Sequence, residues 1–166
     1  PESTVCIIDT RRGKIVEKLP AGHTAQAPVL SHDGKTLYVC CRFNNCVSVF
    51  DLATKKKVRD IPVPREPVGA ALTIDGKHLL VANHIHAGRS DGDVVASTLS
   101  VIDLAAGKVV KDLAFPNGST LLREVRVSPD GKYACVAHTL GRFHLPTTQI
   151  ERAWINSNAL TLIDLA

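Results

Sequence analysis

Three histidines in the sequence have a spacing that could bind a transition metal. His84 and His86 follow the apolar run Leu80–Asn83, and His138 ends a similar run later in the chain. Imidazoles that meet in this way can bind copper, zinc or iron. Histidines in loops also form hydrogen bonds with backbone groups, so a purely structural role is the alternative interpretation.

Other polar and aromatic residues lie in the same irregular segments. The dipeptide Arg123-Glu124 resembles Arg65-Glu66 earlier in the chain, which fits a structural ion pair as well as a ligand clamp. Trp154 could anchor a partner or could pack its own segment onto the fold. The candidates for a ligand or partner site are His84, His86, Arg89, Arg123, Glu124, His138, Arg142, His144 and Trp154.

The cysteines lack the paired spacing of a zinc or haem-attachment motif. Cys40 and Cys135 lie inside apolar runs, where a free thiol behaves as a small hydrophobic group. Cys41 and Cys46 flank residues 42–45 and would face each other across a hairpin, within the Cα separation of a disulfide. Both a disulfide and two free thiols fit this pair.

An internal repeat sets the positions of all these residues. The turn sequence Asp-Gly-Lys begins at Asp33, Asp75 and Asp130, and the first two copies are 42 positions apart. Roughly four strands fit this period, since strands average about 5–6 residues and hairpin loops about 2–5. Four strands in roughly 40 to 45 residues are typical of a β-propeller blade. The sequence therefore predicts an all-β propeller of four-stranded antiparallel blades, with equivalent buried positions at Val39, Val81 and Val136.

The chain accounts for about three blades of a ring that would contain roughly 4 to 8. Residues 1–20 would end one blade, 25–62 and 67–115 would form two whole blades, and 121–166 would supply three strands of another. Thirteen strands are therefore expected. The missing blades would come from further sequence or from a second copy of the chain.

Two blades depart from the shortest repeat. The separation of Val39 from Asp51 is 12 positions, whereas the corresponding separations in the next two copies are 22 and 28. The extra 10 and 16 residues fall within 84–97 and 139–158, and a smaller insertion lies in the crossing 115–124. Because the chain reverses at every hairpin, all three should open on one end of the blades, here called the inserted face. Binding sites concentrate on loops that a rigid scaffold presents.

The repeated motifs resemble the YVTN family of β-propeller repeats over nearly the whole chain. The residues that carry the resemblance are Asp-Gly-Lys, Tyr-Val-Cys-Cys at 38–41, Leu-Val-Ala-Asn at 80–83 and Val-Ser-Val-Phe-Asp at 47–51. This resemblance implies a ring, usually seven-bladed, in a periplasmic or extracellular location, but it says little about function. Residues 141–149 are also similar to propellers beside or fused to c-type cytochrome peroxidase-like domains. That second similarity implies a c-type cytochrome domain as partner, with haem on the partner, because the chain has no Cys-x-x-Cys-His motif.

Composition excludes several function classes. The net charge of +4 and the aromatic content of 4% are too low for the basic stripe and stacking residues of a nucleic-acid surface. No apolar run approaches the ~20 residues that span a bilayer. A nucleophile elbow, a phosphate-binding Gly-rich loop and a zincin helix are all absent from the sequence.

Two functions stay open. In the first, which we favour for this chain alone, a scaffold without a cofactor of its own docks a partner domain or a small ligand on the inserted face. In the second, the same face carries a His/Arg/Glu site, either of a lactonase-type hydrolase or of a metal-dependent oxidoreductase. A metal ion bound by His84, His86 and His138 would favour the second function.

Overall fold

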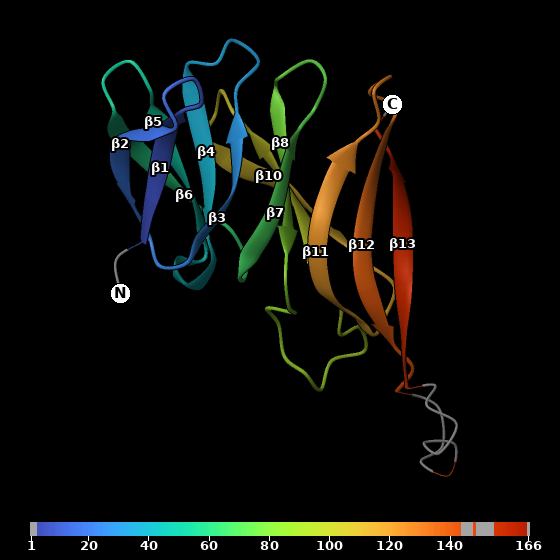
Figure 1. Cartoon of the computed structure of the whole chain (residues 1–166). Helices are drawn as coiled ribbons and strands as arrows, with labels where there is room; N and C mark the ends of the chain where they lie inside the picture. The colour runs from blue at the N-terminus through green and yellow to red at the C-terminus, as the bar shows by residue number, and fades with distance from the viewer. Residues whose placement is uncertain (1–2, 144–147, 149–154, 166) are drawn as a thin grey trace.

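The computed structural model describes residues 3–143, 148 and 155–165. These residues form four antiparallel sheets arranged side by side in the order of the sequence (Figure 1). Within every sheet, neighbouring strands are consecutive in the chain, which is the up-and-down order of a propeller blade. The predicted all-β fold with four-stranded antiparallel units is therefore confirmed.

The first sheet pairs β1 (Ser3–Asp9) with β2 (Lys14–Ala21). The second has the order β3 (Ala25–Leu30), β4 (Thr36–Cys41), β5 (Cys46–Asp51) and β6 (Lys56–Pro62), with the short 3-10 helix η1 (Arg42–Asn44) after β4. The third consists of β7 (Pro67–Leu72), β8 (His78–Asn83), β9 (Thr98–Asp103) and β10 (Lys108–Ala114). The fourth consists of β11 (Ser119–Val127), β12 (Tyr133–Gly141) and β13 (Asn156–Asp164).

The Asp-Gly turns between the first two strands of each unit are stabilised by the Asp side chain. Asp33 Oδ1 accepts hydrogen bonds from Ser31 Oγ at 2.5 Å and from the Lys35 amide at 3.1 Å. Equivalent bonds are formed by Asp75 and Asp130, and the glycine after each Asp has a positive φ. These hydrogen bonds favour the charged carboxylate, so they hold the pKa of all three Asp residues below its ordinary value.

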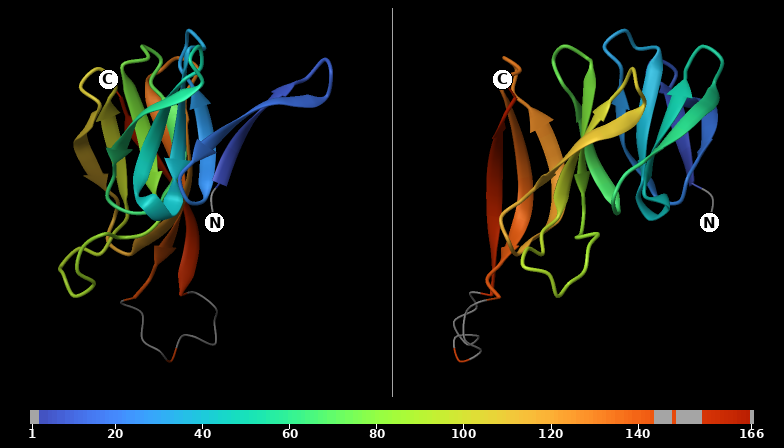
Figure 2. Two further views of the ribbon diagram at one scale, coloured as in Figure 1. Left: turned by 90° about the vertical axis from the view of Figure 1, so that its left-hand side faces the viewer. Right: turned by 180° about the vertical axis from the view of Figure 1, so that it is seen from behind.

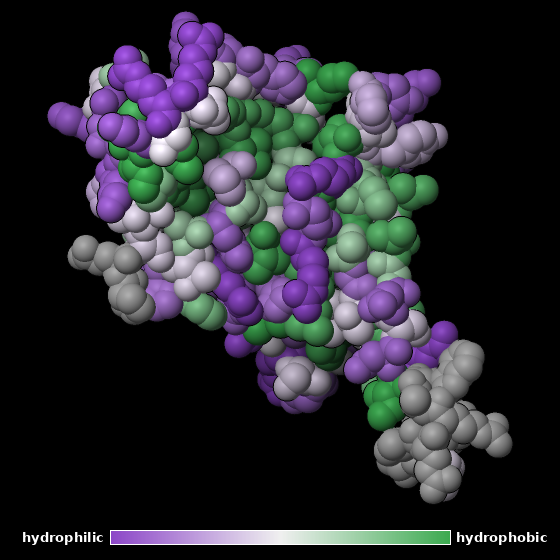
Figure 3. Space-filling view, viewed as in Figure 1, coloured by the Kyte–Doolittle hydropathy of each residue, from purple (hydrophilic) through white to green (hydrophobic). Residues whose placement is uncertain are grey.

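Hydrophobic side chains fill the space between successive sheets. Val39, Val81 and Val136 are fully buried, as the repeat predicts, and each lies on the second strand of its unit. Leu160 and Leu162 of β13 are 72% and 71% exposed, because no described residues cover this side of the fourth sheet. Figure 3 shows hydrophobic surface at this end of the molecule.

The irregular segments lie together at one end of the strands. In Figure 1 residues 84–97 and the adjoining ends of β12 and β13 are at the lower edge, and the Asp-Gly turns are at the upper edge. The view from behind in Figure 2 shows the same separation. Strand pairing continues to Gly141 and Asn156, so the ladder takes up both ends of the predicted insertion 139–158. The sequence Thr148-Gln149-Ile150-Glu151 in this insertion has the spacing of a helix capping box, but apart from Thr148 it lies outside the described residues.

Candidate binding site on the inserted face

A cavity of about 480 Å³ lies on the inserted face where three segments meet. Its walls come from residues within 86–95, from 117–120 in the crossing into β11, and from Gly141 and Phe143. These are the places where the sequence departs from its shortest repeat. The three insertions therefore build one shared site.

Hydrogen bonds to backbone groups, made by the Asn117 side chain and by neighbouring amides, hold the walls of this cavity together. Its Nδ2 donates to the Asp93 carbonyl at 2.9 Å, and its Oδ1 accepts from the Val95 amide at 2.9 Å. The Gly118 amide donates to the Val95 carbonyl at 3.0 Å, and the Gly141 amide donates to the Gly118 carbonyl at 2.8 Å. A Cβ at Gly118 would collide with the Gly141 carbonyl oxygen, and the φ of +88° also favours glycine. The close approach of the crossing and the second insertion thus requires glycine here.

Two polar groups on the cavity wall have no partner among the described side chains and backbone groups. Ser119 is 1% exposed, and its Oγ is one of two buried side-chain polar atoms in the described residues that lack a hydrogen bond. Leaving such a group unsatisfied costs roughly 1–3 kcal/mol. Asp93 is exposed, and within the described part of the chain its carboxylate forms no hydrogen bond or ion pair. A ligand with a hydrogen-bond donor would satisfy both groups.

His86 lines this cavity but is held by the loop that carries it. Its Nδ1 lies 2.8 Å from the Ala96 carbonyl oxygen, and its Nε2 lies 3.2 Å from the Arg89 carbonyl oxygen. The His86 carbonyl in turn accepts a hydrogen bond from Arg65 Nη1 at 3.1 Å. Because both ring nitrogens face backbone oxygens, His86 orders the insertion and does not present a lone pair to a metal.

A column of polar side chains, buried except for its Asp member, repeats from sheet to sheet and was not expected from the sequence. In the second sheet, Cys41 Sγ lies 3.2 Å from Ser48 Oγ, which donates to Asp60 Oδ1 at 2.5 Å. The third sheet has the same column. Asn83 Nδ2 donates to Ser100 Oγ at 2.8 Å, and Ser100 Oγ donates to Asp112 Oδ1 at 2.5 Å. We call this arrangement the hydroxyl column. It runs across the second, third and fourth strands of a unit.

His138 belongs to the hydroxyl column of the fourth sheet. It occupies the repeat position of Cys41 and Asn83 on the second strand, although β12 continues to Gly141, and its Nε2 lies 2.9 Å from Thr161 Oγ1. The ring is only 6% exposed and packs edge-on against Phe115 at a centroid distance of 5.1 Å. His138 is therefore a structural residue of its sheet. Alignment of the repeats would have placed it in one column with Cys41 and Asn83.

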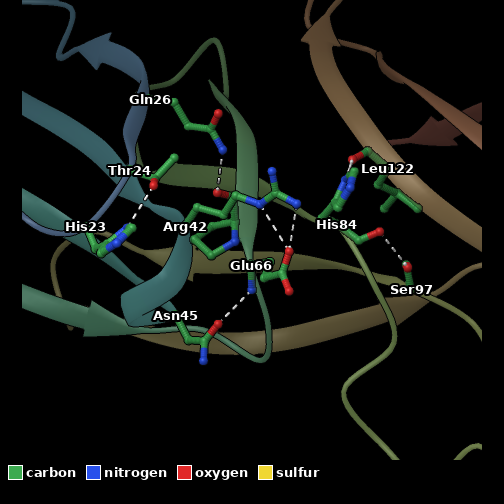
Figure 4. A network of polar contacts seen from close by, with 10 residues as sticks. His23, Thr24, Gln26, Arg42, Asn45, Glu66, His84, Ser97 and Leu122 are labelled. Atoms are coloured by element: carbon green, nitrogen blue, oxygen red, sulfur yellow. Dashed lines mark hydrogen bonds and ion pairs between the residues drawn. The ribbon is translucent and has the colours of Figure 1, made fainter. Parts of the chain in front are cut away.

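His84 joins the third sheet to the fourth (Figure 4). Its Nδ1 is 3.0 Å from the Leu122 carbonyl oxygen, and its own carbonyl accepts hydrogen bonds from Ser97 Oγ at 3.1 Å and from the Leu122 amide at 3.2 Å. The ring also lines a second cavity of about 210 Å³, which lies at the ends of the inner strands and is separate from the 480 Å³ cavity. Arg123 lines this smaller cavity as well.

The three histidines do not form the metal site that their spacing suggested. Among the residues that the structure describes, no group of three or more His, Cys, Asp or Glu side chains could hold a metal ion. The reason is geometric, since His84 faces the inner strands, His86 faces its own loop and His138 is buried in the fourth sheet. The sequence spacing placed the end of β8 just before His84 correctly, but β12 continues past His138 to Gly141, and the spacing did not predict the directions of the rings.

The remaining candidates are dispersed. Arg89 pairs with Asp91 at 2.6 Å, and Glu124 pairs with Arg126 at 2.8 Å. Both Glu residues thus form ion pairs, one of the two interpretations, but with an Arg other than their sequence neighbour, since Glu66 binds Arg42. The backbone amide of Arg142 donates to the Ile155 carbonyl at 2.7 Å. His144 and Trp154 lie outside the described residues.

Cys41 and Cys46 are direct partners across the β4–β5 hairpin, as their spacing predicts, but both thiols are free. A hydrogen bond from the Cys46 thiol lowers the pKa of Cys41 to about 6, and Ser48 contributes in the same direction. Burial raises the pKa of the neighbouring Cys40 to about 12. The structure thus has a buried dithiol at the place where a disulfide was one of two interpretations.

Comparison with known proteins adds a relationship at low identity. No family model matches the chain. Over 124 residues it is 31% identical to hydrazine synthase subunit beta of Kuenenia stuttgartiensis, an alignment that covers 72% of this chain and 30% of that protein. The chain thus spans less than a third of the length of this curated relative.

A solved structure supports the same relationship. Hydrazine synthase of Kuenenia stuttgartiensis superposes with a TM-score of 0.58 and 26% sequence identity, covering 98% of this chain and 57% of that one. The sequence match shows that the chain is homologous, at low identity, to the beta subunit of hydrazine synthase, and the fold match to hydrazine synthase agrees with it.

Proposed function

We propose that the chain is a binding module of a multi-subunit assembly and that a partner protein docks on its inserted face. The observation that carries this proposal is the convergence of three insertions on the 480 Å³ cavity. Ordering a loop costs roughly 1–2 kcal/mol of backbone entropy per residue. A set of insertions that meet at one cavity is therefore best explained by a ligand that uses them.

The wall of the cavity defines the chemistry of the docked group. The Asp93 carboxylate can only accept hydrogen bonds, and the Ser119 hydroxyl has no partner in the described part of the chain. Phe143 adds an aromatic surface at the cavity rim. A Lys or Arg side chain of the partner would satisfy both polar groups and would stack on the ring.

The relationship to a protein named as a subunit supports docking over catalysis. The resemblance of the repeats adds two parts to the proposal, a c-type cytochrome domain as the partner and a location outside the cytoplasm. The lactonase-type and metal-dependent alternatives have less support, because His86 and His138 are committed to hydrogen bonds within the fold.

The proposal can be tested by co-expressing the chain with the subunits encoded beside its gene and measuring complex formation by size-exclusion chromatography. We expect Asp93→Asn to weaken association at least about tenfold, since truncating one partner of a buried charge pair costs roughly 2–5 kcal/mol. Asp91→Asn is the matched control, because Asp91 lies in the same loop and pairs with Arg89 outside the cavity wall. Equal association of both variants and the unaltered chain would exclude this cavity as the docking site.

A further inference from the structure

The 210 Å³ cavity has a basic lining, in contrast to the cavity that contains Asp93. It is lined by Gln26 of β3, Val68 of β7, Arg123 of β11, and the two residues that follow β4 and β8, Arg42 and His84. The first strands of three successive sheets thus meet around it. No carboxylate lines this cavity among the described residues.

One guanidinium at this cavity is neutralised and the other is not. Arg42 donates from Nε and Nη2 to Glu66 Oε2 at 3.0 and 2.9 Å. The Arg123 guanidinium forms no hydrogen bond or ion pair with any other described residue, so its charge has no counterion within this part of the chain. The cavity therefore carries a net positive charge.

The backbone that carries Arg123 is fixed from two sides. A Cβ at Gly69 would lie 2.7 Å from the Arg123 carbonyl oxygen and 3.0 Å from Glu124 Cα, so glycine allows β7 and β11 to approach closely. On the other side, Leu122 is bonded to His84 through both its amide and its carbonyl. Arg123 thus projects from a rigid base, which reduces the entropy lost when it binds a ligand.

We propose that this cavity binds a small oxyanion, with Arg123 as its principal ligand. The guanidinium presents paired N–H donors that match the geometry of carboxylate and phosphate oxygens. Gln26 donates from Nε2 to the Pro67 carbonyl at 3.3 Å, which holds its amide at the cavity wall. A water molecule occupies about 30 Å³ of liquid, so the cavity has room for one small oxyanion and some of its water.

The test is calorimetric titration of the whole chain with sodium phosphate and, separately, with sodium acetate, in buffers of low ionic strength. Sodium chloride at the same ionic strength corrects for screening. We expect saturable binding of at least one oxyanion and a loss of at least tenfold in affinity in Arg123→Gln. A preference for phosphate or for acetate would tell which class of oxyanion the site takes.

Arg12→Gln is the control, because it removes the same charge from an exposed turn that Arg12 shares with Asp9 in the first sheet. Circular dichroism should show an unchanged fold in both variants, since the Arg123 side chain is exposed. Affinity that is unchanged in Arg123→Gln, affinity that falls equally in Arg12→Gln, or no saturable heat from either oxyanion would each overturn the proposal. This result is independent of the Asp93 experiment, because no partner protein is present.

Discussion

His84 and Leu122 are joined by two hydrogen bonds that run in opposite directions between the third and fourth sheets. The His84 ring bonds to the Leu122 carbonyl at 3.0 Å, and the Leu122 amide bonds to the His84 carbonyl at 3.2 Å. Leu122 itself is fully buried, so its carbonyl has little access to water as an alternative partner. This side chain therefore connects two neighbouring units of the fold.

We expect His84→Ala to lower the free energy of unfolding by about 1–3 kcal/mol, because it leaves the buried Leu122 carbonyl unsatisfied. Urea denaturation followed by circular dichroism measures the change. His78→Ala is the control, since no hydrogen bond of the His78 side chain is found among the described residues, and its effect should stay within about 0.5 kcal/mol. Equal losses in both variants would show that the bond to Leu122 does not stabilise the sheet pair.

The hydroxyl column predicts a second stability effect. Ser100→Ala should lower the free energy of unfolding by about 1–3 kcal/mol, because Asn83 and Asp112 both lose a buried partner. Thr10→Ala is the control, because it removes a hydroxyl from an exposed side chain. Urea denaturation of the double variant Ser100→Ala/Asp112→Ala would then measure coupling, and strictly additive losses would contradict a cooperative column.

The Asp-Gly turns predict a loss of stability in acid. The pKa of Asp75 is lowered in the folded chain, first by the Thr73 hydroxyl and then by the Lys77 amide, from an ordinary value of 3.8. Its stabilising contribution is therefore fully present above pH 3.8 and is lost as the pH falls through the lower folded pKa. The same applies to Asp33 and Asp130. The difference in Tm between the unaltered chain and Asp75→Asn should therefore shrink as the pH falls from 7 to 2. A difference in Tm that stays constant over this range would refute a role for the charge of the Asp75 carboxylate.

The cysteines predict a two-step labelling pattern. Cys6 and Cys135 are accessible, while Cys40, Cys41 and Cys46 are buried. N-ethylmaleimide should therefore label two thiols in the folded chain, as counted by intact-mass spectrometry. Unfolding without reductant should then add three labels, because Cys40, Cys41 and Cys46 are free thiols. A single added label would instead show a disulfide between Cys41 and Cys46.

The repeat made the fold predictable because two independent patterns agreed on it. The 42-residue spacing of Asp33 and Asp75 fixed the unit, and the apolar centres at Val39, Val81 and Val136 fixed its core. The face of the insertions followed from chain reversal alone. These properties depend on backbone direction, which hairpins determine locally.

The site itself was less predictable, because it depends on the directions of side chains. His138 turns into its own sheet to meet Thr161, and His86 turns toward the carbonyl groups of its loop. Arg42 and Gln26 line the 210 Å³ cavity from a unit without an insertion, so no irregularity of the repeat marks them in the sequence. Neighbouring sheets bring these residues together, and no single repeat contains that information.

The hydroxyl column gives neighbouring sheets different chemical sensitivities. The second and third sheets have serine at the centre and the fourth has Thr161, but the residue beside the hydroxyl is a thiol in one, an amide in the next and an imidazole in the last. An oxidant that reaches this position would act on Cys41, because the third and fourth sheets have no thiol there. One structural position thus gives each unit a side chain of different chemistry.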